Sequence, residues 1–187
     1  DEDDGPHLIY LPERPFQMTQ FVRDVKATVK QYGRCVVAVS EGIADGNGTP
    51  IVQKNLKSGE KDSHGNVQLS GTGALGDILA AEIKNKTDIK RVRADTFGYL
   101  QRSFAGCVSE VDAAEARRVG EEAVRCASSG EKSGSIAIKR KNSKRYATEY
   151  KRVPLKSVAK ETRHMPDASL NNDGDDVTKR CSDYARP

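Results

Sequence analysis

One stretch near the N-terminus decides the fold, the residues from Leu8 to Gly42, which read LIYLPERPFQMTQFVRDVKATVKQYGRCVVAVSEG. It opens with a short apolar run that Pro12 closes, which is typical of a buried strand. Four apolar residues then recur at helical spacing before a glycine stop at Gly33: Val22, Val25, Val29 and Tyr32. Residues 35–40 are apolar and largely β-branched without alternation, which predicts a second strand covered on both faces. A strand, a helix and a strand in this order predict two parallel strands.

The same alternation continues along the chain. Residues 45–66 read as a loop, and later segments predict a helix over 75–83, a strand over 91–99, a helix from Ser109, and strands over 135–138 and 146–153. Ser109 stands three residues before Asp112, a spacing typical of a helix start. The pattern then places six apolar residues on one side of this helix: Val111, Ala116, Val119, Ala123, Val124 and Ala127.

This order of elements predicts an α/β fold with a mainly parallel sheet and helices on both faces. We expect residues 1–187 to form a single α/β domain.

Composition excludes several classes of protein. The chain has 187 residues, with 31 Lys and Arg against 27 Asp and Glu, so its net charge is only +4. No apolar run approaches the roughly 18 residues of a membrane span, and the acidic N-terminus is unlike a signal peptide. The four cysteines include no CxxC pair, which disfavours a zinc site or a disulfide scaffold. Aromatic residues make up 5% and Trp is absent, which disfavours a base-stacking surface. We expect a cytoplasmic protein that binds neither membrane nor nucleic acid.

Two motifs support alternative functions. Gly71, Gly73 and Gly76 match the dinucleotide pattern GxGxxG, and Asp95 follows at a distance that suits a ribose-binding acid. The only strand before this motif would be a three-residue segment, so a glycine-rich helix entry competes with a dinucleotide-binding module. A basic run also crosses the turn between the last two predicted strands: Lys139, Arg140, Lys141, Lys144 and Arg145. This run favours a solvated hairpin over a non-catalytic nucleic-acid-binding domain.

Ligands of parallel sheets bind beyond the carboxyl ends of the strands. Those ends are Glu13, Glu41 with Gly42, and the turn from Gly98 to Arg102. Arg93 stands six residues before Tyr99, so both would share one face of a strand. Guanidinium groups and a phenol at a strand end suit a phosphorylated polyol, because arginine binds phosphate in a bidentate manner.

Residues 91–102, RVRADTFGYLQR, resemble the sugar-phosphate signature of the phosphofructokinase family, in which an arginine precedes a Gly-[His/Tyr]-x-Gln-Arg turn. Residues 37–42 resemble the family's strand that ends in a substrate-binding glutamate, and residues 11–13 resemble an earlier strand that ends in Pro-Glu. Residues 109–124 and 153–159 resemble later segments of the family. The resemblance therefore extends over nearly the whole chain, in order.

The resemblance implies a transferase that passes a phosphoryl group to the 1-hydroxyl of fructose 6-phosphate, which gives fructose 1,6-bisphosphate in glycolysis. Glu41 would bind the fructose hydroxyls, while Tyr99 and Arg102 would bind the sugar phosphate. Arg93 would bind that phosphate too, in many members from a neighbouring subunit, which implies a homo-oligomer. Tyrosine at position 99 makes pyrophosphate a better candidate donor than ATP.

Other parts of the family pattern do not occur among these residues. They are the glycine-rich donor loop, the Gly-Gly-Asp segment, the Thr-x-Asp motif with the catalytic base, and the Met-Gly-Arg substrate motif. The chain therefore resembles the C-terminal, fructose 6-phosphate-binding half of the enzyme, with the N-terminal donor-binding half absent from this chain. The resemblance also implies Mg²⁺, with ligands outside these residues, and no catalytic residue in the chain itself.

Overall fold

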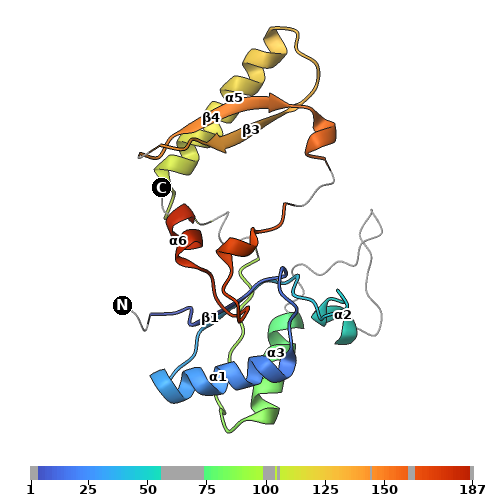
Figure 1. The fold of residues 1–187 in the computed structure, drawn as a ribbon, viewed down its shortest axis with the longest axis vertical. Helices are drawn as coiled ribbons and strands as arrows, with labels where there is room; N and C mark the ends of the chain where they lie inside the picture. The colour runs from blue at the N-terminus through green and yellow to red at the C-terminus, as the bar shows by residue number, and fades with distance from the viewer. Residues whose placement is uncertain are drawn as a thin grey trace. The chain divides into compact units, whose positions relative to one another are not determined.

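The structure is a computed structural model that describes residues 4–55, 74–98, 104, 106–143, 145–159 and 163–185. Its residues form two compact units, which are Asp1–Gly98 with His164–Arg186 (unit 1) and Tyr99–Arg163 (unit 2) (Figure 1). The expectation of a single domain over residues 1–187 stays a prediction.

The predicted strand–helix–strand element at the N-terminus is confirmed. Strand β1 (Leu8–Tyr10) and strand β2 (Val37–Val39) pair in parallel, and helix α1 (Met18–Tyr32) connects them. Gly33 ends the helix in the left-handed conformation with φ of 71°, and its N–H donates to the carbonyl of Val29 at 2.8 Å. A residue with a Cβ atom disfavours this conformation, which explains the glycine at this position.

The core of unit 1 joins the two strands to three helices. Phe21 and Val25 of α1 are buried, and the ring of Phe21 packs edge-on against Tyr10 with the ring centres 5.6 Å apart. Helix α3 (Ala74–Lys86) and helix α2 (Ile51–Asn55) complete the same cluster. Their buried side chains are Leu75, Leu79 and Ile83 of α3 and Ile51 and Val52 of α2. One face of the parallel pair is therefore covered by helices.

Helix α2 lies inside the stretch 45–66 that we predicted to be a loop, in which Ile51 and Val52 were expected to form at most part of a small ribbon. Val52 is completely buried, and Ile51 donates its backbone N–H to the carbonyl of Ile43 at 3.0 Å. The polar residues around this apolar pair hide the helix in the sequence, because tertiary burial rather than local periodicity stabilises so short a helix.

The C-terminal segment of unit 1 packs along the other edge of β1. The backbone N–H of Ile9 donates to the carbonyl of Asp175 at 2.6 Å, and Leu170 is buried. This segment contains a 3-10 turn, η2 (Asp167–Ser169), and the short helix α6 (Lys179–Ala185). Both edges of β1 therefore form hydrogen bonds, one with β2 and the other with the C-terminal segment. These two partners are far apart in the sequence.

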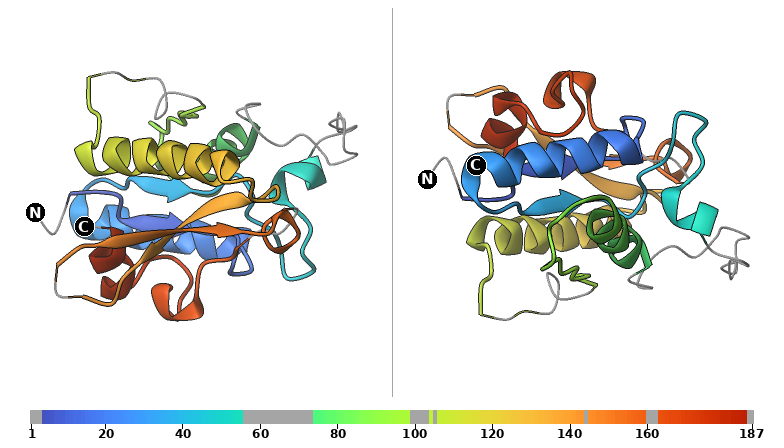
Figure 2. Two further views of the ribbon diagram at one scale, coloured as in Figure 1. Left: turned by 90° about the horizontal axis from the view of Figure 1, so that it is seen from above. Right: turned by 90° about the horizontal axis from the view of Figure 1, so that it is seen from below.

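The described part of unit 2 contains one long helix and one strand pair. Helix α5 (Glu110–Ser128) lies along strands β3 (Ser135–Arg140) and β4 (Thr148–Val153), which pair antiparallel as predicted (Figure 2). The side chain of Ser109 accepts a hydrogen bond from the backbone N–H of Asp112 at 3.2 Å, which confirms the predicted helix start. A 3-10 turn, η1 (Leu155–Ser157), follows β4.

The α/β class is confirmed, but the described sheets are smaller than predicted. They are the parallel pair β1–β2 and the antiparallel pair β3–β4. The predicted strand over 91–99 is wrong for its described part, because residues 91–97 are in no strand. Residues 37–39 are not covered on both faces, because the side chain of Ala38 is exposed. No helix in the described ranges is long and apolar enough to cross a membrane.

The missing third strand has a physical reason. The register of the pair directs the backbone groups of Ala38 to β1, so those of Val37 and Val39 point to the outer edge of β2. No hydrogen bond from this edge to residues 91–97 occurs within the described structure. A strand needs a hydrogen-bonded neighbour, so these residues stay irregular.

We expect Gly33→Ala to lower the free energy of unfolding by about 1 kcal/mol, because alanine disfavours the positive φ at this helix end. Nothing lies within 4 Å of the position that a Cβ would take, so backbone strain is the only cost. Urea denaturation of the purified chain measures the change.

Gly46→Ala is the matched control for this substitution. A Cβ added at Gly46 would also meet open space, but this glycine has no positive φ, so its replacement should change stability little. Equal effects of the two substitutions would contradict the assignment of Gly33 as a strained helix end.

Candidate functional site

The carboxyl end of β1 binds the C-terminal segment of unit 1. The side chain of Glu13 is 15% exposed, and its Oε1 accepts the backbone N–H of Met165 at 3.0 Å. Nδ1 of His164 lies 3.9 Å from the same oxygen. Glu13 was a candidate ligand-binding carboxylate because it follows the carboxyl end of a predicted strand. Its contacts with Met165 and His164 give it a structural role instead.

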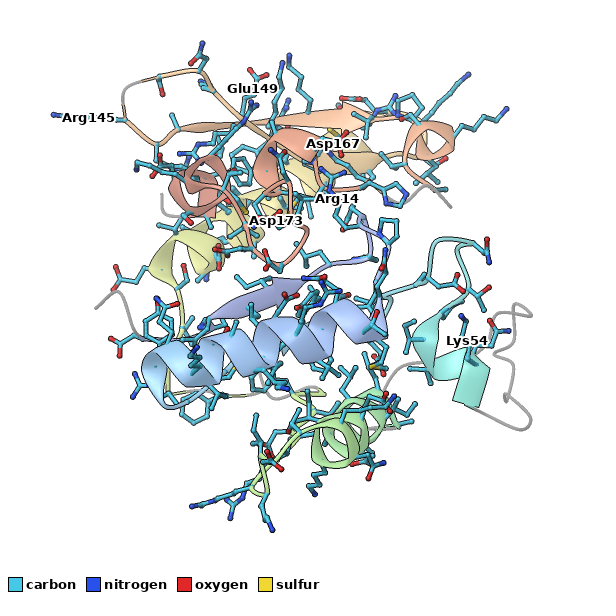
Figure 3. All side chains as sticks on the ribbon, turned by 60° about the horizontal axis from the view of Figure 1, so that its bottom comes forward. Arg14, Lys54, Arg145, Glu149, Asp167 and Asp173 are labelled. Atoms are coloured by element: carbon cyan, nitrogen blue, oxygen red, sulfur yellow. The ribbon has the colours of Figure 1, made fainter. Side chains whose placement is uncertain are left out.

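Arg14 strengthens this connection. Its Nη1 donates to Oδ1 of Asp167 at 3.1 Å, and Figure 3 shows the two labelled side chains pointing toward one another. Gly174 packs beside the same arginine, because a Cβ at Gly174 would lie 3.3 Å from the Cβ of Arg14. Glu13 and Arg14 together hold a segment that is far away in the sequence.

The carboxyl end of β2 carries Glu41 in a tight turn. Ser40 donates its backbone N–H to the carbonyl of Tyr10 at 2.9 Å, and Ile43 donates to the carbonyl of Ser40 at 3.2 Å. Glu41 and Gly42 therefore lie just beyond the last residue bonded to β1. A Cβ at Gly42 would lie 3.7 Å from Pro12, so the turns after the two strands are neighbours. Glu41 is half-buried at this end of the parallel pair, where strand geometry predicted it.

The loop after Glu41 is organised by Asp45. Its Oδ1 accepts the backbone N–H groups of Asn47 and Thr49, each at 2.9 Å, and its Oδ2 lies 2.5 Å from Nζ of Lys54. The contact with Lys54, followed by these backbone donors, lowers the pKa of the Asp45 carboxyl. The closed loop brings Ile43 and α2 into the core, so it also fixes the turn that carries Glu41.

The residues that carry the family signature are only partly within the described structure. Arg93 is exposed in the irregular stretch 91–97, so it does not share a strand face with Tyr99. Gly98 is in a turn with φ of 54°, which confirms the turn predicted at this glycine. Tyr99 and Arg102 lie outside the described residues. Of the four predicted residues, the structure therefore describes Glu41 and Arg93, and the predicted site stays a prediction.

Packing explains Gly76, the last glycine of the motif that matches the dinucleotide-binding pattern. A Cβ at Gly76 would lie 2.8 Å from the Cβ of Ala94, closer than side chains approach one another. A glycine is therefore required for the close approach of α3 to the chain at Ala94, with or without a nucleotide. Gly71 and Gly73 lie outside the described residues, and Asp95 is exposed in the irregular stretch.

A polar hollow lies on another side of unit 1. It has a volume of about 510 Å³, and Glu41 and Arg93 are not among its lining residues. Tyr10 lies beside it with its hydroxyl donating to Oδ2 of Asp24 at 2.8 Å. Burial, followed by this hydrogen bond, raises the pKa of the Tyr10 phenol far above its ordinary value. This geometry stabilises β1 against α1 and shows no relation to the predicted sugar-phosphate site.

No metal centre is found among the described residues. Within those ranges, no group of three or more His, Cys, Asp or Glu side chains is arranged to hold a metal ion. The expectation that Mg²⁺ ligands lie outside the chain stays a prediction.

The comparison with protein families identifies the class. Residues 3–127 match the phosphofructokinase family, so the chain belongs to that family, and the resemblance drawn from the signature is confirmed. The matched range includes residues 71–76, so the glycine motif is part of a phosphofructokinase sequence.

Individual relatives narrow the comparison to one branch. The chain is 55% identical over 186 residues to the pyrophosphate–fructose 6-phosphate 1-phosphotransferase of Rhodospirillum rubrum, covering 100% of this chain and 46% of the relative. It is 35% identical over 185 residues to the protein of the same name from Xanthomonas campestris, covering 99% and 43%. The crystal structure of a pyrophosphate-dependent phosphofructokinase from Marinobacter aquaeolei aligns with a TM-score of 0.76 and 26% identity, covering 100% of this chain and 41% of that one. The chain thus spans less than half the length of these relatives.

Sequence reasoning missed the structural role of Glu13 and Arg14. Glu13 is 152 positions from its partner Met165, and Arg14 is 153 positions from Asp167. The sequence signal was a charged pair directly after a buried strand, which fits a ligand site and a structural contact equally well. Only the position of the C-terminal segment distinguishes the two.

We expect the loop after Glu41 to loosen in acid. The folded chain holds the pKa of Asp45 below its ordinary value of 3.8, so the ionised carboxylate stabilises the loop at any pH above that value. This stabilisation is lost as the pH falls through the lower folded value. Below about pH 3.8, the backbone amides of Asn47 and Thr49 should therefore exchange hydrogen faster than the intrinsic pH dependence of amide exchange predicts.

Asp45→Asn is the control, because the amide keeps an oxygen acceptor but has no titrating charge. Its loop should be less protected at neutral pH and should show no further change in acid. An unaltered acid response in this variant would assign the effect to another carboxylate.

Proposed function

We propose that this chain is the fructose 6-phosphate-binding part of a pyrophosphate-dependent phosphofructokinase, a cytoplasmic glycolytic transferase. The observation that carries the proposal is the 55% identity to the Rhodospirillum rubrum enzyme across the whole chain. The position of Glu41, half-buried at the carboxyl end of β2, agrees with it. The reaction transfers a phosphoryl group from pyrophosphate to the 1-hydroxyl of fructose 6-phosphate and yields fructose 1,6-bisphosphate.

In this proposal the residues of the chain bind and orient the acceptor. The Glu41 carboxylate accepts hydrogen bonds from the fructose hydroxyls and sets the direction of the 1-hydroxyl. Arg102 binds the 6-phosphate through charge-assisted hydrogen bonds, and Tyr99 donates its phenol hydrogen to the same group. Such fixed contacts accelerate transfer between two bound substrates by holding the acceptor oxygen in line with the donor.

The donor side of the reaction needs residues that this chain does not contain. The base that takes the proton of the 1-hydroxyl and the loop that holds pyrophosphate belong to motifs outside these 187 residues. Mg²⁺ offsets the negative charge of the transferring group when it is bound. We assign the metal no ligand in this chain.

The 187-residue chain alone should show no turnover of fructose 6-phosphate with either pyrophosphate or ATP, because it lacks the base and the donor loop. The comparison is a hybrid enzyme. In this hybrid, the 187 residues of the chain replace the matching region of the Rhodospirillum rubrum relative. We expect the hybrid to turn over with pyrophosphate, measured by coupled formation of fructose 1,6-bisphosphate. Turnover above background by the chain alone would contradict the proposal.

Arg102→Ala in the hybrid enzyme should raise the KM for fructose 6-phosphate roughly ten- to hundredfold, since a charge-assisted phosphate contact contributes about 1.5–3 kcal/mol. The KM for pyrophosphate should change little. Arg145→Ala is the matched control, because Arg145 is an exposed arginine in the β3–β4 connection with no proposed role. An unchanged KM in a folded Arg102 variant would refute this assignment.

Arg93 should complete the phosphate site of a neighbouring subunit. This exposed arginine lies in the irregular stretch 91–97, which pairs with no strand within the described structure, so it is accessible to another chain. The test mixes inactive Arg93→Ala hybrid with inactive Arg102→Ala hybrid after dissociation. Activity returns on reassociation if the two arginines serve sites in different subunits, since some mixed sites then hold both. If activity does not return, both arginines belong to one subunit's site.

A further inference from the structure

The turn that carries Glu41 is attached at both ends to the end of β1 and the chain that follows it. At the start of the turn, the backbone N–H of Ser40 donates to the carbonyl of Tyr10 at 2.9 Å. Beyond the turn, the carbonyl of Ala44 accepts the backbone N–H of Phe16 at 2.7 Å. The chain between Tyr10 and Phe16 therefore spans the two points of attachment. Its shape decides where the Glu41 carboxylate lies.

Residues 11–15, which we call the bridge, make up this spanning chain. The backbone N–H of Arg14 donates to the carbonyl of Leu11 at 3.3 Å, which is longer than the usual limit of about 3.2 Å and therefore weak. Pro12 of the bridge lies against the turn of Glu41, because a Cβ at Gly42 would be 3.7 Å from the Cβ of Pro12. A movement of the bridge would thus be passed directly to the residue next to Glu41.

The C-terminal segment of unit 1 supports the bridge from its other side. Oε1 of Glu13 accepts the backbone N–H of Met165 at 3.0 Å, and the side chain of Glu13 is only 15% exposed. Arg14 also reaches this segment, but the side chain of its partner Asp167 is 84% exposed. Water and salt screen such an exposed ion pair, so it contributes little. The sheltered hydrogen bond of Glu13 is therefore the stronger of the two supports.

We propose that Glu13 is a positioning residue for substrate binding. By holding the bridge against the C-terminal segment, it fixes the turn from which Glu41 binds the fructose hydroxyls. Glu13 acts through Glu41 and contacts no substrate itself, since its Oε1 already accepts the N–H of Met165. What Glu41 binds rests on the proposed function, whereas the connection between Glu13 and the turn rests on the hydrogen bonds alone.

The first experiment measures hydrogen exchange in the 187-residue chain without substrate. Glu13→Ala removes the acceptor for Met165, so the backbone amides of Ser40 and Phe16 should exchange about two- to tenfold faster, the effect of one hydrogen bond. Glu13→Gln keeps a side-chain oxygen that accepts the same N–H and should restore slow exchange. The proposal is wrong if the alanine variant leaves both amides unchanged, or if the glutamine variant is no slower than the alanine variant.

The second experiment measures kinetics of the hybrid enzyme. Glu13→Ala should raise the KM for fructose 6-phosphate about two- to tenfold and leave the KM for pyrophosphate unchanged, and Glu13→Gln should behave like the unchanged hybrid. In a hybrid that already carries Glu41→Ala, the same substitution should cause no further rise, because the residue that Glu13 positions is gone. A merely structural role of Glu13 would instead raise the KM equally in both backgrounds.

Glu82→Ala is the matched control. Glu82 is a half-buried carboxylate of α3 that pairs with Lys86 at 3.5 Å and not with the C-terminal segment, so its removal should change neither exchange at the turn nor the KM. Where Glu13→Ala destabilises the fold, Glu13→Leu keeps the bulk of the side chain and still offers no acceptor.

The two experiments separate a failure of the positioning role from a failure of the proposed function. If Glu41→Ala leaves the KM for fructose 6-phosphate unchanged, the role proposed for Glu41 is wrong, and exchange still shows whether Glu13 fixes its turn. If Glu41→Ala raises the KM but Glu13→Ala has no effect, or an equal effect in both backgrounds, only the positioning role of Glu13 is wrong.

Discussion

The parallel pairing of β1 with β2 is the interaction on which the rest of unit 1 depends. It places Tyr10 and Val39 side by side, so that one face of the pair meets Phe21 and Val25 of α1. Because the strands run in the same direction, their carboxyl ends emerge at one edge. Glu13 and Glu41 therefore arise at neighbouring positions, although α1 and two loops separate them in the sequence.

The two carboxylates at this edge have different roles because their surroundings differ. Glu13 accepts the backbone N–H of Met165 and is largely covered by the C-terminal segment. Glu41 stands in a turn whose shape is set by the hydrogen bonds of Ser40 and by the closed loop around Asp45. One strand end thus anchors the chain, and the other presents a carboxylate at the position where α/β proteins bind ligands.

Both units have surfaces that the described chain does not cover. In unit 1 the outer edge of β2 directs the backbone groups of Val37 and Val39 away from β1. In unit 2 the side chains of Ala116, Ala123 and Val124 on α5 are exposed.

The sequence by itself determined the α/β class, α1 with its glycine end, the start of α5 and the pairing of β3 with β4, because periodicity, capping and turn residues are local signals. It also determined the family, since the signature and the Ser-Glu-Gly strand end are written in consecutive residues. Tertiary structure alone decided that Ile51 begins a helix, that Glu13 holds Met165, and that residues 91–97 form no strand. Each of these depends on a partner distant in the sequence or on the lack of one within the described structure. Of the six apolar residues that helical spacing placed on one side of α5, Val111 and Val119 are half-buried and the other four are exposed. Helical spacing shows which residues are apolar, but only the packing of β3 and β4 decides which of them are covered.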